Sequence, residues 1–126
     1  MENFKHADVT EAVIKGFYSV YNNLGYGFLE KVYENSLAIE LRLLGVTVEQ
    51  QKGISVYYRD KIVGEYKADM IVNDRVIVEL KWAEIINQAH EAQLVNYLKA
   101  TKYEVGLLLN FGRSATFRRK IFDIGR

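Results

Sequence analysis

The sequence predicts an α/β domain in which a mixed β-sheet is flanked by helices. In roughly the first 45 residues the apolar positions recur at helical spacing, whereas from Val46 onward they alternate with a period of two. A further helical pattern then separates two predicted strands, and a helix that crosses between two strands of one sheet joins parallel neighbours. The predicted order is therefore two helices, three or four strands, a helix and two strands.

Two helices are predicted before the strands begin. The segment from Asp8 to Glu11 has the spacing of a capping box, and apolar residues then recur from Val9 to Leu24, immediately before Gly25. A second pattern covers Leu29 to Leu44. It ends at Gly45, where a helix commonly closes with a left-handed residue.

The rest of the chain alternates short apolar segments with turn residues. An antiparallel meander is predicted over Val46–Gln51, Ile54–Tyr58, Ile62–Val72 and Arg75–Lys81, with turns at Arg59-Asp60-Lys61 and Asn73-Asp74. A third helix is predicted over about Ile86–Thr101, a buried strand over Glu104–Asn110 and an edge strand over Thr116–Phe122.

Length and composition indicate one folded domain over residues 1–126. The chain has no proline, no internal repeat and no Gly/Ser-rich linker, and its hydrophobic (49%) and charged (26%) fractions are those of globular proteins. Without cysteine it has neither disulfides nor thiolate zinc sites, and two histidines make a His-rich metal site improbable. A domain of this length buries roughly two-thirds of its unfolded surface without such help.

No segment predicts contact with a membrane. The longest apolar runs, such as Val105–Leu109, are far shorter than the roughly 18 residues that span a bilayer. Met1-Glu2-Asn3 does not begin a signal peptide, so we expect a cytoplasmic protein.

The net charge of +1 conceals an uneven distribution. Residues 113–126 carry five basic side chains and one acidic side chain, a balance of +4, whereas the remainder has 12 basic and 15 acidic residues, a balance of −3. The basic residues are Arg113, Arg118, Arg119, Lys120 and Arg126. This asymmetry suits either an edge that binds a polyanion beside an acidic site or a solvated basic strand.

The register of one predicted hairpin brings two carboxylates together. Its even-numbered residues are apolar and must share the core face: Tyr66, Ala68, Met70, Val72, Val76, Val78 and Leu80. That register pairs residues whose numbers sum to 148, so Asp69 lies opposite Glu79 and Lys67 opposite Lys81. It also requires a three-residue connection, Asn73-Asp74-Arg75, or a bulge, with Asn or Asp in the left-handed conformation.

Two opposed carboxylates repel one another, so a neighbouring positive charge must offset the cost. A divalent cation would do so, and oxygen ligands with few histidines favour Mg²⁺ or Mn²⁺ over zinc. Alternatively, Lys67 and Lys81 neutralise Asp69 and Glu79 in a solvent-exposed cluster across the two strands. The spacing of the residues alone leaves both interpretations open.

The residues Asp69-x9-Glu79-x-Lys81 resemble the signature of the PD-(D/E)XK nuclease superfamily, with Ala68 in place of its proline. Gly27-x-x-Glu30-x-x-Tyr33 and Gln93-x-x-x-Tyr97 extend the match over nearly the whole chain. The first of these motifs is similar to that of the GxxExxY proteins, a small prokaryotic family placed in that superfamily. The resemblance implies a restriction-endonuclease-like core in αβββαβ order.

The resemblance also implies a metal-dependent nuclease, a hydrolase of phosphodiester bonds with DNA the favoured substrate. Its catalytic residues would be Glu30, Asp69, Glu79, Lys81, Gln93 and Tyr97. Asp69, Glu79 and the Leu80 carbonyl would hold Mg²⁺ or Mn²⁺, and Glu30 would complete the acidic cluster directly or through water. Lys81 would orient the attacking water and stabilise the transition state, while the side chains from the third helix would position phosphate or water.

Structural roles compete with these functional ones. A carboxylate in the first turn of a helix, such as Glu30, gains about 0.3–1 kcal/mol from the helix dipole alone. Tyr33 is expected to pack rather than to touch substrate, His90 to be an ordinary polar residue, and Trp82 to shield the edge of the site.

Other functions for the whole domain also stay open at this point. One is a non-catalytic nucleic-acid-binding or regulatory module that retains the nuclease fold, and another is an oligomer whose acidic face is structural. A net charge near zero suggests that a nuclease of this size needs a homodimer or a protein partner to grip nucleic acid.

Overall fold

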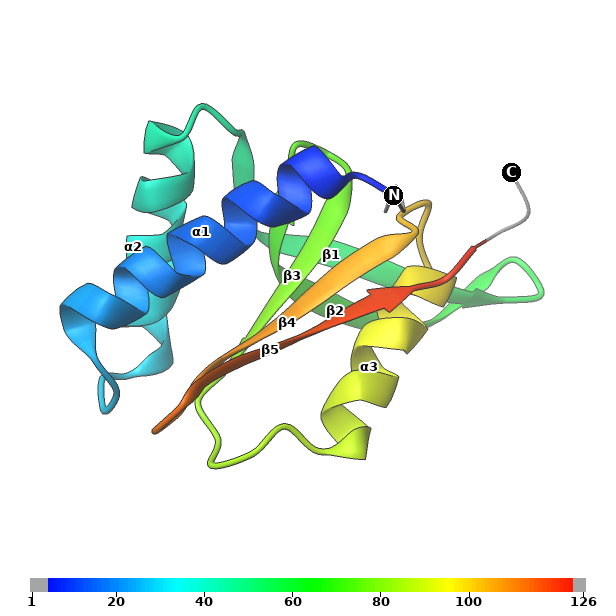
Figure 1. Ribbon diagram of the computed structural model, residues 1–126. Coiled ribbons are helices and arrows are strands. Elements are labelled where there is room, and N and C mark those ends of the chain that lie inside the picture. The colour runs from blue at the N-terminus through cyan, green and yellow to red at the C-terminus, as the bar shows by residue number, and fades with distance from the viewer. Residues whose placement is uncertain (1–4, 124–126) are drawn as a thin grey trace.

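In the computed structural model, two helices cover one face of a five-stranded sheet and a third helix covers the other (Figure 1). The structure describes residues 5–123. Within these residues no helix is long and apolar enough to cross a membrane. The elements are α1 (Ala7–Leu24), α2 (Glu30–Leu43), β1 (Val48–Tyr58), β2 (Lys61–Val72), β3 (Val76–Lys81), α3 (Gln88–Lys99), β4 (Val105–Phe111) and β5 (Ala115–Ile121). The predicted α/β class and the αβββαβ core, from α2 to β4, are confirmed.

The sheet is mixed, with its strands in the order β1-β2-β3-β4-β5. β3 and β4 are parallel and are connected through α3, whereas the other neighbours are antiparallel. The predicted separation of Val46–Gln51 from Ile54–Tyr58 is wrong, because β1 is continuous. One irregularity lies at Gln51, which has a positive φ of 55° and interrupts the alternation without ending the strand, and a second is a shift in the register with β2 between Val56 and Tyr57.

The predicted helices agree with the observed ones to within about two residues at each end, but the predicted cap of α1 is wrong. Asp8 does not cap this helix; His6 occupies the N-cap position without a side-chain bond, and Asp8 instead forms an exposed ion pair with Arg75 at 3.4 Å. At the end of α2, Gly45 adopts the expected left-handed conformation, with φ 84°. The Gly45 and Val46 amides donate to carbonyls in the last turn of α2, which closes the helix as a Schellman motif.

The predicted register of the β2–β3 hairpin is confirmed over the three pairs nearest the turn, whereas the predicted pair of Lys67 with Lys81 is not part of the ladder. Val72 pairs with Val76 and Met70 with Val78, across a three-residue connection in which Asn73 has the expected positive φ. The expectation of one continuous apolar face is wrong at its outer end. Met70 packs under α1 and α2, whereas Ala68 packs under α3.

The change of face coincides with the Gln51 irregularity. The pairs Gln50–Met70 and Lys52–Ala68 flank this position, so β2 turns beside Asp69 and Tyr66 faces Tyr97 of α3. Gln51 and Asp69, which lie between these two pairs, are not partners in the ladder, although its register is the same on both sides. This twist of β2 therefore occurs beside one of the two paired carboxylates.

A buried asparagine fixes the chain immediately after β3. Asn110 in β4 has no exposed surface; its Oδ1 accepts from the Ala83 amide at 2.9 Å and its Nδ2 donates to the Ala83 carbonyl at 2.8 Å. Gly112 allows this approach, because a Cβ at that position would lie 2.1 Å from the Ala83 oxygen. The two contacts hold the end of β3, which carries Glu79 and Lys81, against β4.

We expect Asn110→Ala to lower the free energy of unfolding by about 2 kcal/mol, because both partly buried backbone groups of Ala83 would lose their partner. Chemical denaturation measures the change. Asn23→Ala, which removes an exposed hydrogen bond to Ser19 at the end of α1, is the control and is expected to change little. Equal effects of the two substitutions would contradict the proposed role of Asn110.

Candidate active site

Two carboxylates replace backbone hydrogen bonds where β2 and β3 separate. The ladder ends at Met70–Val78; beyond it the Asp69 amide donates to Oε2 of Glu79 at 2.7 Å, and the Leu80 amide donates to Oδ2 of Asp69 at 2.8 Å. Each carboxylate therefore binds the main chain of the opposite strand. Asp69 and Glu79 therefore lie opposite each other as predicted, joined by these reciprocal hydrogen bonds.

Burial gives the pair its unusual electrostatics. Glu79 is only 5% exposed, so the alternative of a solvent-exposed charge cluster is wrong for this residue. Burial, reinforced by the charge of Asp69, raises the pKa of Glu79 to about 8. Burial also raises the pKa of Asp69, although the hydrogen bond from Leu80 opposes that shift.

Lys81 and Glu30 approach this pair from two different elements. Lys81 lies at the end of β3. Its ammonium is close enough to oppose the rise in the pKa values of Asp69, Glu79 and Glu30. Glu30 opens α2, and its own pKa is raised first by burial and then by the charge of Asp69. The structure thus brings together four of the predicted catalytic residues, three acidic and one basic.

Sequence reasoning missed a second acidic residue on α2. Glu34 is 1% exposed, accepts hydrogen bonds from the side chains of Gln50 (2.7 Å) and Gln51 (2.8 Å), and pairs with Lys31 at 3.3 Å. Glu34 lies one helical turn after Glu30, and that spacing of four residues was the signal that could have identified it.

The same contacts involve Gln51, the residue of β1 with a positive φ. The left-handed conformation of Gln51 lets one amide group reach both Glu34 and, at 3.5 Å, Oδ1 of Asp69. Glu30, Lys31, Glu34, Gln51 and Asp69 line a small cavity of about 260 Å³. The acidic pair on the sheet is therefore connected to α2 through the side chain of Gln51.

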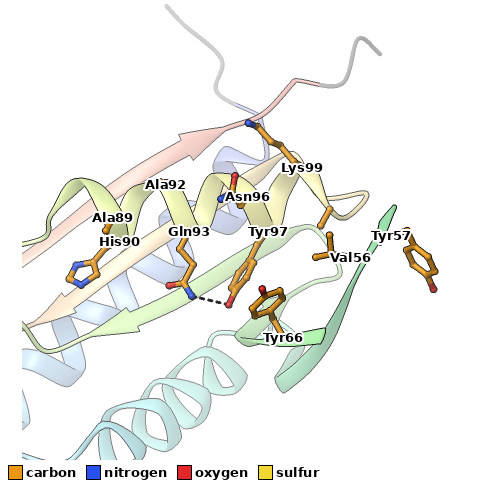
Figure 2. A pocket seen from close by; sticks show the side chains of 11 residues that line it. Val56, Tyr57, Tyr66, Ala89, His90, Ala92, Gln93, Asn96, Tyr97 and Lys99 are labelled. Carbon is orange, nitrogen blue, oxygen red and sulfur yellow. Dashed lines mark hydrogen bonds between the residues drawn. The ribbon is translucent and has the colours of Figure 1, made fainter. Parts of the chain in front are cut away.

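Gln93 and Tyr97 reach the site from α3. The Gln93 side-chain amide donates to the Tyr97 hydroxyl at 3.1 Å, and both side chains point down from the helix toward the sheet (Figure 2). Burial and the nearby charge of Glu79 raise the pKa of Tyr97, so its hydroxyl keeps a proton that it can donate. All six predicted catalytic residues thus lie around one edge of the sheet.

Two of the other residues considered in the sequence, Tyr33 and His90, have structural contacts. Tyr33 stacks on Phe111 at 4.4 Å and donates to the Gly25 carbonyl at 2.7 Å, which fixes the loop before α2. His90 forms a capping box with Asn87 at the start of α3. Trp82 is half-exposed in the segment that follows β3.

The predicted basic strand is partly occupied by contacts within the domain. In β5, an edge strand as predicted, Lys120 forms an ion pair with Glu91 and Arg119 donates to the Lys5 carbonyl at 2.7 Å. Two of the basic residues therefore bind neighbouring segments of the chain. Arg126, like Met1-Glu2-Asn3, lies outside the described residues.

The donor set fits a hard divalent cation. Asp69 and Glu79 offer carboxylate oxygens. The Leu80 amide points toward β2, where it donates to Asp69, and the carbonyl of the same residue in a strand points to the same side. Over residues 5–123, no group of three or more acidic or histidine side chains is close enough to hold an ion. The arrangement is thus a carboxylate pair with a backbone oxygen, and Glu30 lies within electrostatic range.

The raised pKa values predict a pH-dependent stability. Between about pH 5 and pH 8 the native protein holds a proton on Glu79 that the unfolded chain has released, so the metal-free protein loses stability as the pH rises. We expect the free energy of unfolding to fall by more than about 1 kcal/mol over that interval, which corresponds to several degrees in Tm. Glu79→Gln, the control, should flatten the profile; identical profiles for the two proteins would contradict the assignment.

Comparisons with known proteins agree with this architecture. A family model for the PD-(D/E)XK nuclease superfamily matches residues 7–121. The crystal structure of SSO0001 is similar with a TM-score of 0.58 and 17% sequence identity, over 94% of this chain and 59% of that one, so this likeness shows the fold alone. No curated protein matches the sequence. With a matching family model over nearly its whole length, the chain belongs to the PD-(D/E)XK nuclease superfamily.

Proposed function

We propose that this domain hydrolyses phosphodiester bonds in nucleic acid, with DNA the favoured substrate and Mg²⁺ or Mn²⁺ as cofactor. The observation that supports it most directly is the buried Asp69–Glu79 pair with Lys81 at the same edge of the sheet. Membership of a nuclease superfamily adds support for the reaction class. A hard cation bound to these oxygen atoms would offset the repulsion between the two carboxylates.

The cofactor would be held by Asp69, Glu79 and the Leu80 carbonyl, with Glu30 as a further ligand directly or through water. When bound, a divalent cation supplies Lewis-acid polarisation of the phosphate and lowers the pKa of water. The hydrogen bonds from the Leu80 and Asp69 amides keep the two carboxylates in place before the ion arrives. Glu79 would release its proton when such an ion binds, because cation and proton compete for the same oxygens.

Lys81 and the α3 pair act on the reacting groups. The ammonium of Lys81 is positioned by β3 among the carboxylates, where it orients the attacking water and offsets the negative charge that develops on the phosphate. Gln93 holds the Tyr97 hydroxyl, which donates its proton in a hydrogen bond to a phosphate oxygen. Lys81 comes from β3 and the other two side chains come from α3, and both elements contribute to one buried apolar cluster, which suits these side chains to preorganisation.

A non-catalytic nucleic-acid-binding module is the second candidate function. It is favoured by the absence, within the described residues, of a closed cluster of three acidic side chains. Such a module would bind nucleic acid without turnover.

We also propose that the domain acts in the prokaryotic cytoplasm and that a second copy or a protein partner contributes to binding of the substrate.

The decisive test is cleavage of single- and double-stranded DNA and RNA with Mg²⁺ or Mn²⁺. We expect Lys81→Ala and Glu79→Gln each to reduce the rate about 100-fold or more, because both remove charge from the reacting centre. Lys67→Ala is the matched control: this lysine is exposed on β2 beside the site, pairs with Gly53 across the ladder, and should leave the rate unchanged.

Absence of cleavage by the wild-type chain, under conditions in which it remains folded, would overturn the catalytic proposal and support the binding module. Cleavage that persists in both Lys81→Ala and Glu79→Gln would instead indicate a contaminating nuclease. Melting temperatures of all variants confirm that any lost activity does not reflect unfolding.

A further inference from the structure

A large groove lies beside the carboxylate site, between α3 and the hairpin of β1 and β2 (Figure 2). Its volume is about 990 Å³, far larger than the acidic cavity. Gln93 and Tyr97 line it. Tyr97 is also close enough to Glu79 and Asp69 for their charges to reinforce the rise that burial causes in the pKa of its hydroxyl. The groove therefore lies next to the site where we propose that phosphodiester bonds are cleaved, and Tyr97 borders both.

The chemistry of the groove is opposite to that of the acidic cavity. None of its lining residues is acidic, and Lys99 contributes a positive charge. Ala89, Ala92 and Ala100 supply short side chains on the α3 wall, while His90 and Asn96 add hydrogen-bonding groups. A polyanionic chain that is repelled by free carboxylates meets no such repulsion here.

On the opposite wall the ring of Tyr66 faces α3, whereas the ring of Tyr57 points away from the helix (Figure 2). Tyr66 is 50% exposed and lies 5.7 Å from the ring of Tyr97, tilted by 43°. Tyr57 is 62% exposed at the outer end of the groove. Figure 2 shows the Tyr66 ring below Tyr97, on the side of the groove toward the sheet. The twist at Gln51 places Tyr66 here, because it turns this part of β2 toward α3.

We propose that this groove binds an unpaired nucleic-acid strand, with a base stacked on Tyr66 next to the phosphodiester held at Asp69 and Glu79. The inference rests on the proposed function, which it refines by naming the form of the substrate. Stacking on an aromatic side chain needs an accessible base face. In a duplex the faces are covered by neighbouring bases, so a paired strand cannot use this wall.

The low net charge of the chain supports the same conclusion. Proteins that grip duplex DNA neutralise many phosphates, whereas this chain has a net charge of +1 and engages Arg119 and Lys120 in contacts with its own segments. Stacking supplies affinity without added charge. Unpaired DNA and unpaired RNA share this chemistry, and the experiment distinguishes them.

Fluorescence anisotropy in EDTA measures binding without cleavage. The probes are labelled oligodeoxyuridylate and oligouridylate, which differ only in the sugar, together with a duplex of the same length and an abasic strand, which keeps the phosphates but has no bases. We expect the wild-type chain to bind a single strand about tenfold or more tightly than the duplex or the abasic strand. The stronger of the two single-stranded probes identifies the sugar that the groove prefers.

Tyr66→Ala tests the stacking surface, with Tyr58→Ala as its matched control. Tyr58 is 64% exposed on the same hairpin but does not line the groove. We expect Tyr66→Ala to weaken single-strand binding about tenfold without affecting duplex binding, whereas Tyr58→Ala should change neither.

Equal affinity for single strand and duplex, or unchanged binding by Tyr66→Ala, would overturn the proposal. So would a change in oligomeric state caused by Tyr66→Ala with unaltered oligonucleotide binding, because the groove would then be a contact between two copies of the chain. Binding in EDTA is independent of turnover. Absence of cleavage and absence of single-strand binding in the groove are therefore distinguishable outcomes.

Discussion

The reciprocal hydrogen bonds between the Asp69 and Glu79 side chains and the opposite main chains are the constraint on which the rest of the site depends. They let β2 and β3 separate without leaving amides unsatisfied, which a buried sheet does not tolerate. The separation opens the edge that α2 and α3 approach from opposite faces. The cost is two carboxylates held close together with raised pKa values, and that cost is what a bound cation would relieve.

The surrounding contacts keep this strained arrangement in place. Asn110 fixes the chain after β3, the amide of Gln51 connects Asp69 with Glu34, and Tyr33 fixes the loop that begins α2. Gln51 has a second consequence, because its left-handed backbone accompanies the twist that turns Tyr66 toward α3. One irregular residue in β1 therefore contributes both to the acidic cavity and to the aromatic groove, and this links the proposed chemistry to the proposed form of the substrate.

Much of the fold was predictable because apolar periodicity encodes local structure directly. The β2–β3 register followed from a single requirement, that apolar side chains share a face, and it placed Asp69 against Glu79 correctly. The same rule failed at Ala68 and Tyr66, because the left-handed Gln51 has no signature in a sequence read strand by strand. Asp8 had capping-box spacing but does not cap α1. Glu34 and Asn110 were missed as site residues because their importance arises from burial between distant elements.

The central claim is that Glu79 holds a proton in the metal-free protein and exchanges it for a divalent cation. Carbon-13 NMR of the Glu79 side-chain carboxyl, titrated with pH in the presence and absence of Mg²⁺, tests this directly. The account predicts a pKa of about 8 without the ion and a large decrease when Mg²⁺ is added. A pKa near that of an ordinary glutamate, or one that Mg²⁺ does not change, would contradict it.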